Sequence, residues 1–316
     1  MLAHIVFNVA IGASLVGIAI CQQQVLRGDQ PADDRVVKRI ITPELTEFTN
    51  NIMQDYNMSG LALGAVHSND IIEVAAFGRK TEDNDTMTAD TLFDMGSCSK
   101  AFLASAVGIL IDDFAQGKNR TPLPSGVQRL DWHTRLIDLL PGDWQLMDEW
   151  ASQQATIRDI LSHQSGLPRH DISYHADQKP VDVVRQLRHL WPAFELRQRW
   201  HYNNLFYVTG AHIISTFSGM SYIEFVKERI FDPLGMTAST FDPEEAARDG
   251  RLTQTWTADG RRLPVWFTGN AVELIAGAGG IISNVVDMTK WLRMLLNAGG
   301  DPATNKTIIP QKLSTR

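Results

Sequence analysis

The tetrapeptide Ser97-Cys-Ser-Lys100 places a hydroxyl nucleophile and an amine three positions apart. In a helix, residues i and i+3 share one face, so the hydroxyl and the amine can meet in its first turn. A serine attacks a carbonyl only after a base removes its proton, and a lysine is a base only when it is neutral. Neutrality requires a pKa below the ordinary value of about 10.4, and burial together with the positive end of the helix dipole lowers it. The same spacing also fits an ordinary helix start, with Ser97 as the N-cap and Lys100 extending to solvent.

A second polar group, Tyr202-Asn203-Asn204, precedes another stretch with a helical pattern. The phenol of Tyr202 can relay protons, most easily as a phenolate beside a cationic lysine. The amide of Asn204 can hydrogen-bond both to Lys100 and to a substrate carbonyl. The structural alternative is a tyrosine in the first turn of a helix, packed against Trp200.

Other catalytic chemistries have weaker support. Cys98 follows Ser97 directly, but on a helix it points about 100° away, which favours a small buried core residue. His163, His170 and His175 are not part of a His-Glu-x-x-His zinc motif, and a core histidine is the better interpretation of His163. No Gly-x-Ser-x-Gly elbow occurs, which argues against an α/β-hydrolase.

The segments that must position these residues alternate between strand and helix patterns. A hairpin is predicted from two apolar runs, 61–66 and 71–77, around the polar turn 67–70. The stretch from Ser97 to Gly117 is apolar on nearly every face, which predicts a central, buried helix. Further helices are predicted over 43–56, 205–217, 222–230 and 284–296, with a helical pattern over 123–200 that prolines interrupt. A tight turn is expected at 231–236 and short strands at 253–256 and 264–268. This order predicts an α+β (α/β) layer with an inserted helical region.

The segment FDMGSCSKAF, which contains Ser97 and Lys100, resembles the first motif of class C β-lactamases, D-alanyl-D-alanine peptidases and the esterases that share their fold. Tyr202-Asn203-Asn204 is similar to their Tyr-x-Asn motif. Further landmarks of this serine β-lactamase and penicillin-binding-protein superfamily match at 160–168, at 231–236, and at 277–281 with Asp287. The order and spacing agree over roughly residues 40 to 315, and we interpret the last three landmarks as structural.

The resemblance implies a β-lactamase/transpeptidase-like fold, in which an antiparallel sheet is flanked by helices and carries an inserted all-helical region. It implies that Ser97 is the acylated nucleophile and that its backbone N–H is one oxyanion donor. Lys100 and Tyr202 would share general-base and general-acid catalysis, and Asn204 would orient Lys100 and the substrate. The expected reaction is hydrolysis of an ester or amide bond in a small-molecule or peptide-like substrate through an acyl-enzyme, without a metal ion or a cofactor.

A third motif of the superfamily, a Lys/His-Thr/Ser-Gly-like triplet on an inner strand, does not follow Tyr202 in this sequence. In relatives the triplet supplies the second oxyanion donor and meets the substrate carboxylate. Because the sequence ends at Arg316, we expect the domain over residues 40–316 to be incomplete, with the C-terminal strands missing. Two hypotheses therefore remain: a serine hydrolase, or a truncated and catalytically inactive relative.

The N-terminus carries an apolar run from Ile5 to Cys21 and then turns polar. This run has the length of a signal-peptide core and is short for a membrane span, although no Lys or Arg precedes Arg27. We predict a signal peptide over 1–21, a leader segment over 22–39 and a secreted protein, with membrane association only if the run stays uncleaved. Asn-x-Ser/Thr sequons at Asn57, Asn84, Asn119 and Asn305 agree with a secreted glycoprotein.

The composition bounds the class of protein. A chain of 316 residues with 44% hydrophobic residues can bury a core as one large domain or as two closely packed ones. The net charge of −7 argues against a nucleic-acid partner, because phosphate binding depends on clustered Lys and Arg. Within the β-lactamase-related domain, a helical subdomain is expected over about 118–250.

Overall fold

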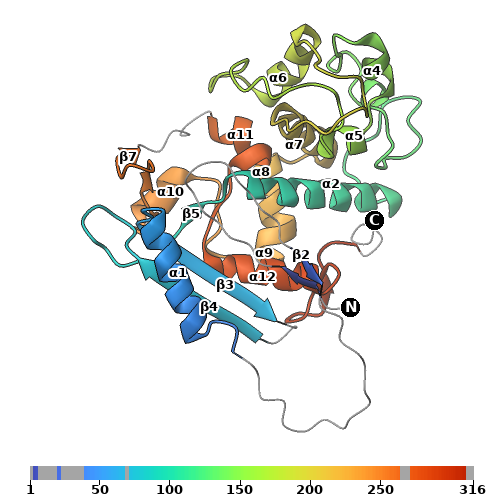
Figure 1. Cartoon of the computed structure of the whole chain (residues 1–316). Helices are drawn as coiled ribbons and strands as arrows, with labels where there is room; N and C mark the ends of the chain where they lie inside the picture. Colours follow the sequence, from blue (N-terminus) through green and yellow to red (C-terminus); the bar gives the residue numbers. More distant parts are fainter. Residues whose placement is uncertain (1–2, 6–19, 23–38, 68–70, 264–270, 311–316) are drawn as a thin grey trace.

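The computed structural model of the chain describes residues 3–5, 20–22, 39–67, 71–263 and 271–310. A β-hairpin lies at one end of the molecule and a group of helices lies at the other. Helix α2 (Ser99–Ala115) runs between these two parts (Figure 1). The arrangement agrees with the predicted α+β architecture.

The hairpin consists of β3 (Gly60–His67) and β4 (Ile71–Gly78), as the two apolar runs predicted. The strands are antiparallel, in a register that pairs Gly60 with Gly78 and His67 with Ile71. In the described part of the chain, β3 and β4 pair only with each other. Helix α1 (Pro43–Asp55), which begins at the N-cap Thr42, packs on the hairpin (Figure 1). Helix α12 (Val285–Leu296), which is far away in the sequence, also contacts β3.

Helix α2 is the centre of the hydrophobic core, as its apolar composition predicted. Its side chains Phe102, Leu103 and Val107 are fully buried. The ring of Phe102 stacks on Trp291 of α12, with the ring centroids 4.0 Å apart. A 3₁₀ turn, η1 (Gly96–Cys98), leads directly into α2, so that the Ser97-x-x-Lys100 motif spans the junction of the two.

Two glycines allow two further helices to approach α2 closely. Gly210 lies in α7 (Leu205–Ser218) and Gly277 lies in α11 (Ala271–Gly279), and both face Leu103 of α2. A Cβ on Gly277 would lie 2.4 Å from Leu103 Cδ1 and 2.6 Å from the backbone oxygen of Tyr207. The sequence pattern had indicated only the landmark at 277–281 here and had not predicted helix α11.

A small antiparallel sheet ties the start of α2 to the segment that follows α11. Strand β5 (Phe93–Asp94) pairs with β8 (Ile282–Ser283). The backbone N–H of Met95 donates to the carbonyl of Ile281 at 2.8 Å, and the N–H of Ile281 donates to Ser99 Oγ at 3.0 Å. The turn that carries Ser97 is therefore fixed on both sides. Before it, β5 pairs with β8, and after it, Ser99 at the start of α2 accepts a hydrogen bond from the Ile281 N–H.

The region over 123–200 is less helical than the sequence pattern predicted. It contains only short helices joined by loops: α3 (Leu136–Leu139), α4 (Glu149–Gln154), α5 (Ile157–Leu161), α6 (Pro180–Gln186) and the 3₁₀ turn η2 (Leu187–His189). The prolines explain the difference, because a proline fits the first turn of a helix but not its interior. Pro180 starts α6, whereas Pro141 and Pro192 follow the ends of short helices.

The other predicted helices are present with small shifts of their ends. Helix α8 (Tyr222–Val226) continues into a π-helical turn, η3 (Lys227–Phe231), and then into α9 (Asp232–Leu234), which ends at Gly235 as the predicted turn. Asp287 in α12 is buried and accepts hydrogen bonds from Ala238 N and Ser239 Oγ, in agreement with a structural landmark. The remaining elements are α10 (Pro243–Arg248), β6 (Thr255–Trp256), β7 (Arg262–Leu263), β9 (Gly300–Asp301) and β10 (Lys306–Thr307). The strand predicted at 264–268 lies outside the described residues.

Most of the predicted signal peptide also lies outside the described residues. The described residues there form β1 (Ala3–Ile5) and β2 (Ile20–Gln22), which extends one residue past the predicted segment and pairs antiparallel with β1. The signal peptide and the domain boundaries stay predictions. Among the residues that the structure describes, no helix has both the length and the apolar character needed to cross a bilayer.

The substitution Gly277→Ala tests the close packing of α2, α7 and α11. The added methyl group would overlap Leu103 and the backbone of α7, so the free energy of unfolding should fall by about 1–3 kcal/mol. Denaturant unfolding followed by tryptophan fluorescence measures the change. Glu273→Ala, at an exposed position of the same helix, leaves the helix contacts unchanged and serves as the control. Equal stability of Gly277→Ala and the unmodified chain would contradict the packing argument.

Candidate active site

Ser97 stands on the 3₁₀ turn η1 at the surface, where a substrate can reach it. The residue before it, Gly96, has φ = 48°. A side chain at Gly96 would meet no atom within 4 Å, so the left-handed backbone conformation, and not a lack of space, favours glycine here. The Gly96 N–H donates to Asp94 Oδ1 at 3.0 Å and fixes the turn. The sequence Asp-Met-Gly-Ser therefore forms a turn that presents the serine hydroxyl.

Lys100 is buried below this hydroxyl, with only 7% of its surface exposed. Its Nζ atom lies 3.2 Å from Ser97 Oγ, 2.8 Å from Asn204 Oδ1 and 2.6 Å from the carbonyl oxygen of Ala278. Burial lowers the pKa of Lys100 to about 7, and the nearby positive charge of Arg169 acts in the same direction. A large fraction of the lysine is therefore neutral at neutral pH and can accept a proton.

Tyr202 approaches the same hydroxyl from another side. Its phenol oxygen lies 2.5 Å from Ser97 Oγ, and its ring centroid lies 4.7 Å from Lys100 Nζ. Burial raises the pKa of Tyr202 above its ordinary value, so the phenol is protonated at neutral pH. The structure thus brings all four residues that the sequence singled out, Ser97, Lys100, Tyr202 and Asn204, into one hydrogen-bonded cluster.

His163 holds the loop that carries Tyr202. Its Nδ1 accepts the backbone N–H of Asn203 at 3.1 Å, and its carbonyl accepts the N–H of His201 at 2.8 Å. The buried amide of Asn203 then donates to the carbonyl of Pro168 at 2.6 Å. Burial and the charge of Lys100 lower the pKa of His163 to about 4, so the ring is neutral. These contacts agree with the predicted structural role of His163.

Three groups at the site were missed by the sequence reasoning. The Ala278 carbonyl at the end of α11 accepts from Lys100, Asp171 Oδ1 accepts from Asn204 Nδ2 at 3.0 Å, and the Arg169 guanidinium lies 4.9 Å from the centroid of the Tyr202 ring. Arg169 Nε also pairs with Asp171 Oδ2 at 2.5 Å. Arg169 and Asp171 follow the landmark at 160–168 within three residues. This proximity to a family landmark was the one feature of the sequence that could have pointed to them.

Cys98 has the environment of a core residue. Its side chain is half-buried and packs against the main hydrophobic cluster. Burial raises the pKa of the Cys98 thiol, which opposes formation of the reactive thiolate. Among the residues that the structure describes, there is no cluster of three or more His, Cys, Asp or Glu side chains arranged to hold a metal ion.

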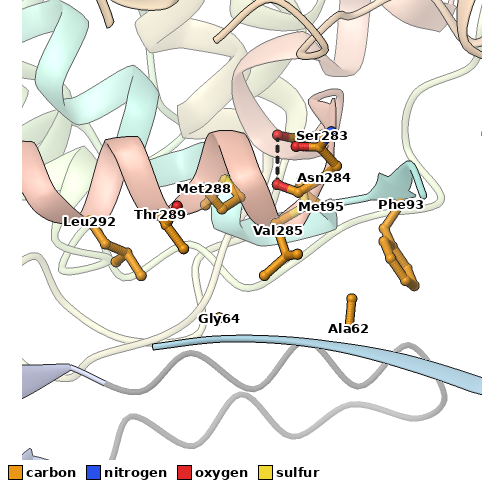
Figure 2. Close-up of a pocket in the computed structure, with 10 residues that line it drawn as sticks. All are labelled: Ala62, Gly64, Phe93, Met95, Ser283, Asn284, Val285, Met288, Thr289 and Leu292. Carbon is orange, nitrogen blue, oxygen red and sulfur yellow. Dashed lines mark hydrogen bonds between the residues drawn. The ribbon is translucent and has the colours of Figure 1, made fainter. Parts of the chain in front are cut away.

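A cavity of about 50 Å³ lies between β3 and α12, away from this cluster (Figure 2). Figure 2 shows Ala62 and Gly64 on β3 facing Val285, Thr289 and Leu292 on α12. None of the site residues lines it in the described part of the chain, and its walls are mostly apolar. The cavity is a gap in the packing of the hairpin and does not border the nucleophile.

Comparison with known proteins supports the same assignment. The family model described as beta-lactamase matches residues 45–314, which is most of the chain. The chain therefore belongs to the beta-lactamase family, as the motifs around Ser97 and Tyr202 predicted.

Two curated relatives and two solved structures illustrate the similarity. The chain is 30% identical over 266 residues to "Unguisins hydrolase ungD'" of Aspergillus campestris, covering 82% of this chain and 48% of that protein. It is 27% identical over 259 residues to "Penicillin-binding protein 4" of Amycolatopsis lactamdurans, covering 78% of this chain and 62% of that protein. The chain thus spans about half to two thirds of the length of these relatives.

The structural neighbours have the same fold. The octameric penicillin-binding protein homologue from Pyrococcus abyssi superposes with a TM-score of 0.68 at 22% identity, over 86% of this chain and 58% of that one. The D-amino acid amidase from Ochrobactrum anthropi SV3 superposes with a TM-score of 0.63 at 25% identity, over 84% and 72% of the two chains. These neighbours confirm the predicted β-lactamase/transpeptidase-like fold.

The pKa of Lys100 gives a prediction about pH. Below pH 7 the amine is protonated and cannot accept the Ser97 proton, so the rate of acylation should rise with pH through a midpoint near 7, where the pKa of Lys100 lies. The rate constant for labelling by a fluorophosphonate, measured across this range, provides the test. The pKa of His163 is about 4 and lies too low to produce this midpoint. A rate that does not change between about pH 5 and 9 would contradict the role of Lys100 as the base.

Proposed function

We propose that this chain is a serine hydrolase that cleaves ester or amide bonds through a covalent acyl-enzyme on Ser97. One observation carries the proposal: the buried amine of Lys100 and the phenol of Tyr202 both contact Ser97 Oγ, at 3.2 Å and 2.5 Å. A nucleophile flanked by a base and an acid within hydrogen-bond distance is the arrangement that acyl transfer requires.

The hydrogen bonds support different roles for Lys100 and Tyr202, one as the base and the other as the acid. Asn204 Oδ1 and the Ala278 carbonyl can only accept, so they hold the two N–H groups of a neutral lysine. The remaining lone pair then faces Ser97 Oγ, and the protonated phenol of Tyr202 donates to the same oxygen. Lys100 is therefore proposed as the first base and Tyr202 as the first acid.

The proposed cycle begins when the Ser97 proton passes to Lys100 Nζ and the Oγ electron pair attacks the substrate carbonyl carbon. The carbonyl π pair moves to oxygen, and we propose the Ser97 backbone N–H as one donor to this oxyanion. Collapse of the intermediate breaks the bond to the leaving group, which takes a proton from the Tyr202 phenol. The proton held by Lys100 restores Tyr202. A water molecule then hydrolyses the acyl-enzyme, with Lys100 and Tyr202 again exchanging the protons.

Small amides and peptides are the substrates that the relatives suggest. One relative is named a hydrolase of unguisins and one structural neighbour is a D-amino acid amidase that was crystallised with L-phenylalanine amide. Trp200 is 64% exposed, and its ring centroid lies 6.3 Å from that of Tyr202. We propose that this indole packs against an apolar part of the substrate.

We also propose that the protein is secreted. The apolar run from Ile5 to Cys21 supports a signal peptide. The four sequon asparagines Asn57, Asn84, Asn119 and Asn305 are all exposed, so an oligosaccharide transferase can reach each of them.

Covalent labelling tests the proposed nucleophile and base. The chain should react with a fluorophosphonate probe, and Ser97→Ala should abolish the reaction. Lys100→Ala should slow it by about 10²–10⁴-fold, because the base is lost, and Tyr202→Phe should slow it less. In-gel fluorescence with mass spectrometry of the modified peptide measures both the rate and the site.

Cys98→Ala is the matched control, since it changes the neighbouring side chain and should leave labelling unchanged. Retention of labelling by Ser97→Ala would refute the assignment of the nucleophile. Absence of labelling in the unmodified chain would favour the hypothesis of an inactive relative.

Secretion predicts a mature N-terminus near Gln22. Expression in a eukaryotic host, followed by N-terminal sequencing of the protein in the medium, determines whether the apolar run is removed. Treatment with an N-glycosidase should lower the mass of the protein if the sequons are used. A chain that retains Met1 and sediments with membranes would contradict cleavage and would favour an uncleaved anchor.

A further inference from the structure

Asp171 contacts the side of the Asn204 amide that faces away from Lys100, and it does not contact Ser97. It is in the loop between α5 and α6, and its two carboxylate oxygens have different partners. Oδ1 accepts a hydrogen bond from Asn204 Nδ2 at 3.0 Å, while Oδ2 pairs with Arg169 Nε at 2.5 Å. The ion pair with Arg169, two positions earlier in the same loop, fixes the direction of the other oxygen.

The chemistry of these groups allows only one orientation of the Asn204 amide. A carboxylate has acceptors and no donor, so Asp171 can pair only with the NH₂ group of the amide, whether Lys100 is charged or neutral. The amide lies between the two, so its oxygen must face Lys100 and its nitrogen must face Asp171. Without the carboxylate, the amide is free to turn and present its NH₂ group to the amine. Lys100 would then have to direct its lone pair at Asn204 instead of at Ser97.

We propose that Asp171 is a positioning residue for the Ser97 acylation step, which fixes the Asn204 amide so that the lone pair of Lys100 points at the nucleophile. This inference rests on the proposed serine-hydrolase function. Arg169 supports the same arrangement, because it pairs with Asp171 and its guanidinium also lies over the Tyr202 ring. The loop that carries Arg169 and Asp171 therefore contacts Tyr202 directly and reaches Lys100 through the Asn204 amide.

The charge of Asp171 provides a readout that a purely structural residue would not affect. Its negative charge raises the pKa of Lys100 against the larger lowering by burial. Loss of the carboxylate should therefore lower the pKa of Lys100 and move the acidic limb of the rate profile to lower pH. The titratable or charged groups that face Lys100 from the surrounding elements are Cys98, His163, Arg169, Asp171, Tyr202 and Tyr207.

The experiment separates orientation from charge with two substitutions in the full chain. Asp171→Ala removes the acceptor and should lower kinact for a fluorophosphonate about 10–100-fold at unchanged KI, a fraction of the whole general-base effect. Asp171→Asn keeps an oxygen that can accept from Asn204 and should retain most of kinact. Both variants should move the midpoint of the pH profile to lower pH. Asp177→Ala, at an exposed position of the same loop, is the matched control and should behave as the unmodified chain.

A second pair of variants tests whether Asp171 acts through Asn204. In an Asn204→Ala background the amide is absent, so adding Asp171→Ala should cause no further fall in kinact. An equal fall in both backgrounds, or an unchanged kinact in Asp171→Ala, would overturn the proposal. If Asp171→Ala does not fold, an unshifted pH midpoint in Asp171→Asn overturns it instead. If the unmodified chain is not labelled at all, the proposed function is refuted. If the unmodified chain is labelled but the variants do not behave as described, only this inference fails.

Discussion

The burial of the Lys100 amine is the constraint on which the rest of the site depends. A lysine in this position loses the hydration of its charge, so the folded protein must either surround it with acceptors or leave it neutral. The structure does both in part. Oxygens from Ser97, Asn204 and Ala278 surround the nitrogen, and the pKa still falls to about 7. The amine is thus close to the balance between its two protonation states, which suits the role of general base that we propose for Lys100.

The fold meets this constraint by bringing three helices to one point. Lys100 is in the first turn of α2, Ala278 is near the end of α11, and Asn204 is the N-cap of α7. Helices normally pack about 8–10 Å apart, at a distance set by the side chains between them. Gly210 and Gly277 remove side chains at the contact with Leu103, which allows a backbone carbonyl of α11 to reach the buried amine. The close packing of α2, α7 and α11 therefore also sets the position of the hydrogen-bond acceptors around Lys100.

The sequence predicted those site residues that form short motifs with their neighbours in the chain. It missed the groups that distant segments bring to the site. Ser97 and Lys100 are three positions apart on one turn, and Tyr202 and Asn204 are two apart, so each pair forms a local motif, and the resemblance to the superfamily joined the two motifs into one site. The Ala278 carbonyl belongs to the backbone, which every residue has, and no residue type marks it. Asp171 reaches Asn204 from a loop 33 positions away, and only the folded chain brings the two side chains together. The hairpin and the long helices were predicted for the same reason of local periodicity, whereas the proline-rich region over 123–200 needed the structure.

That irregular region and the loop after it supply Arg169, Asp171 and Tyr202, because loops can direct several side chains at one small target. A helix presents neighbouring side chains about 100° apart, so few of its residues can face one small target. The loops that follow α5 and precede α7 place the Tyr202 phenol against the Ser97 hydroxyl, Arg169 against the Tyr202 ring and Asp171 against the Asn204 amide. Left-handed backbone at His163, His170 and Arg197 occurs in the same segment, and such conformations are costly for residues with side chains. The buried contacts of His163 and Asn203 stabilise these bends, so the rigidity of the Tyr202 loop comes from the core beneath it.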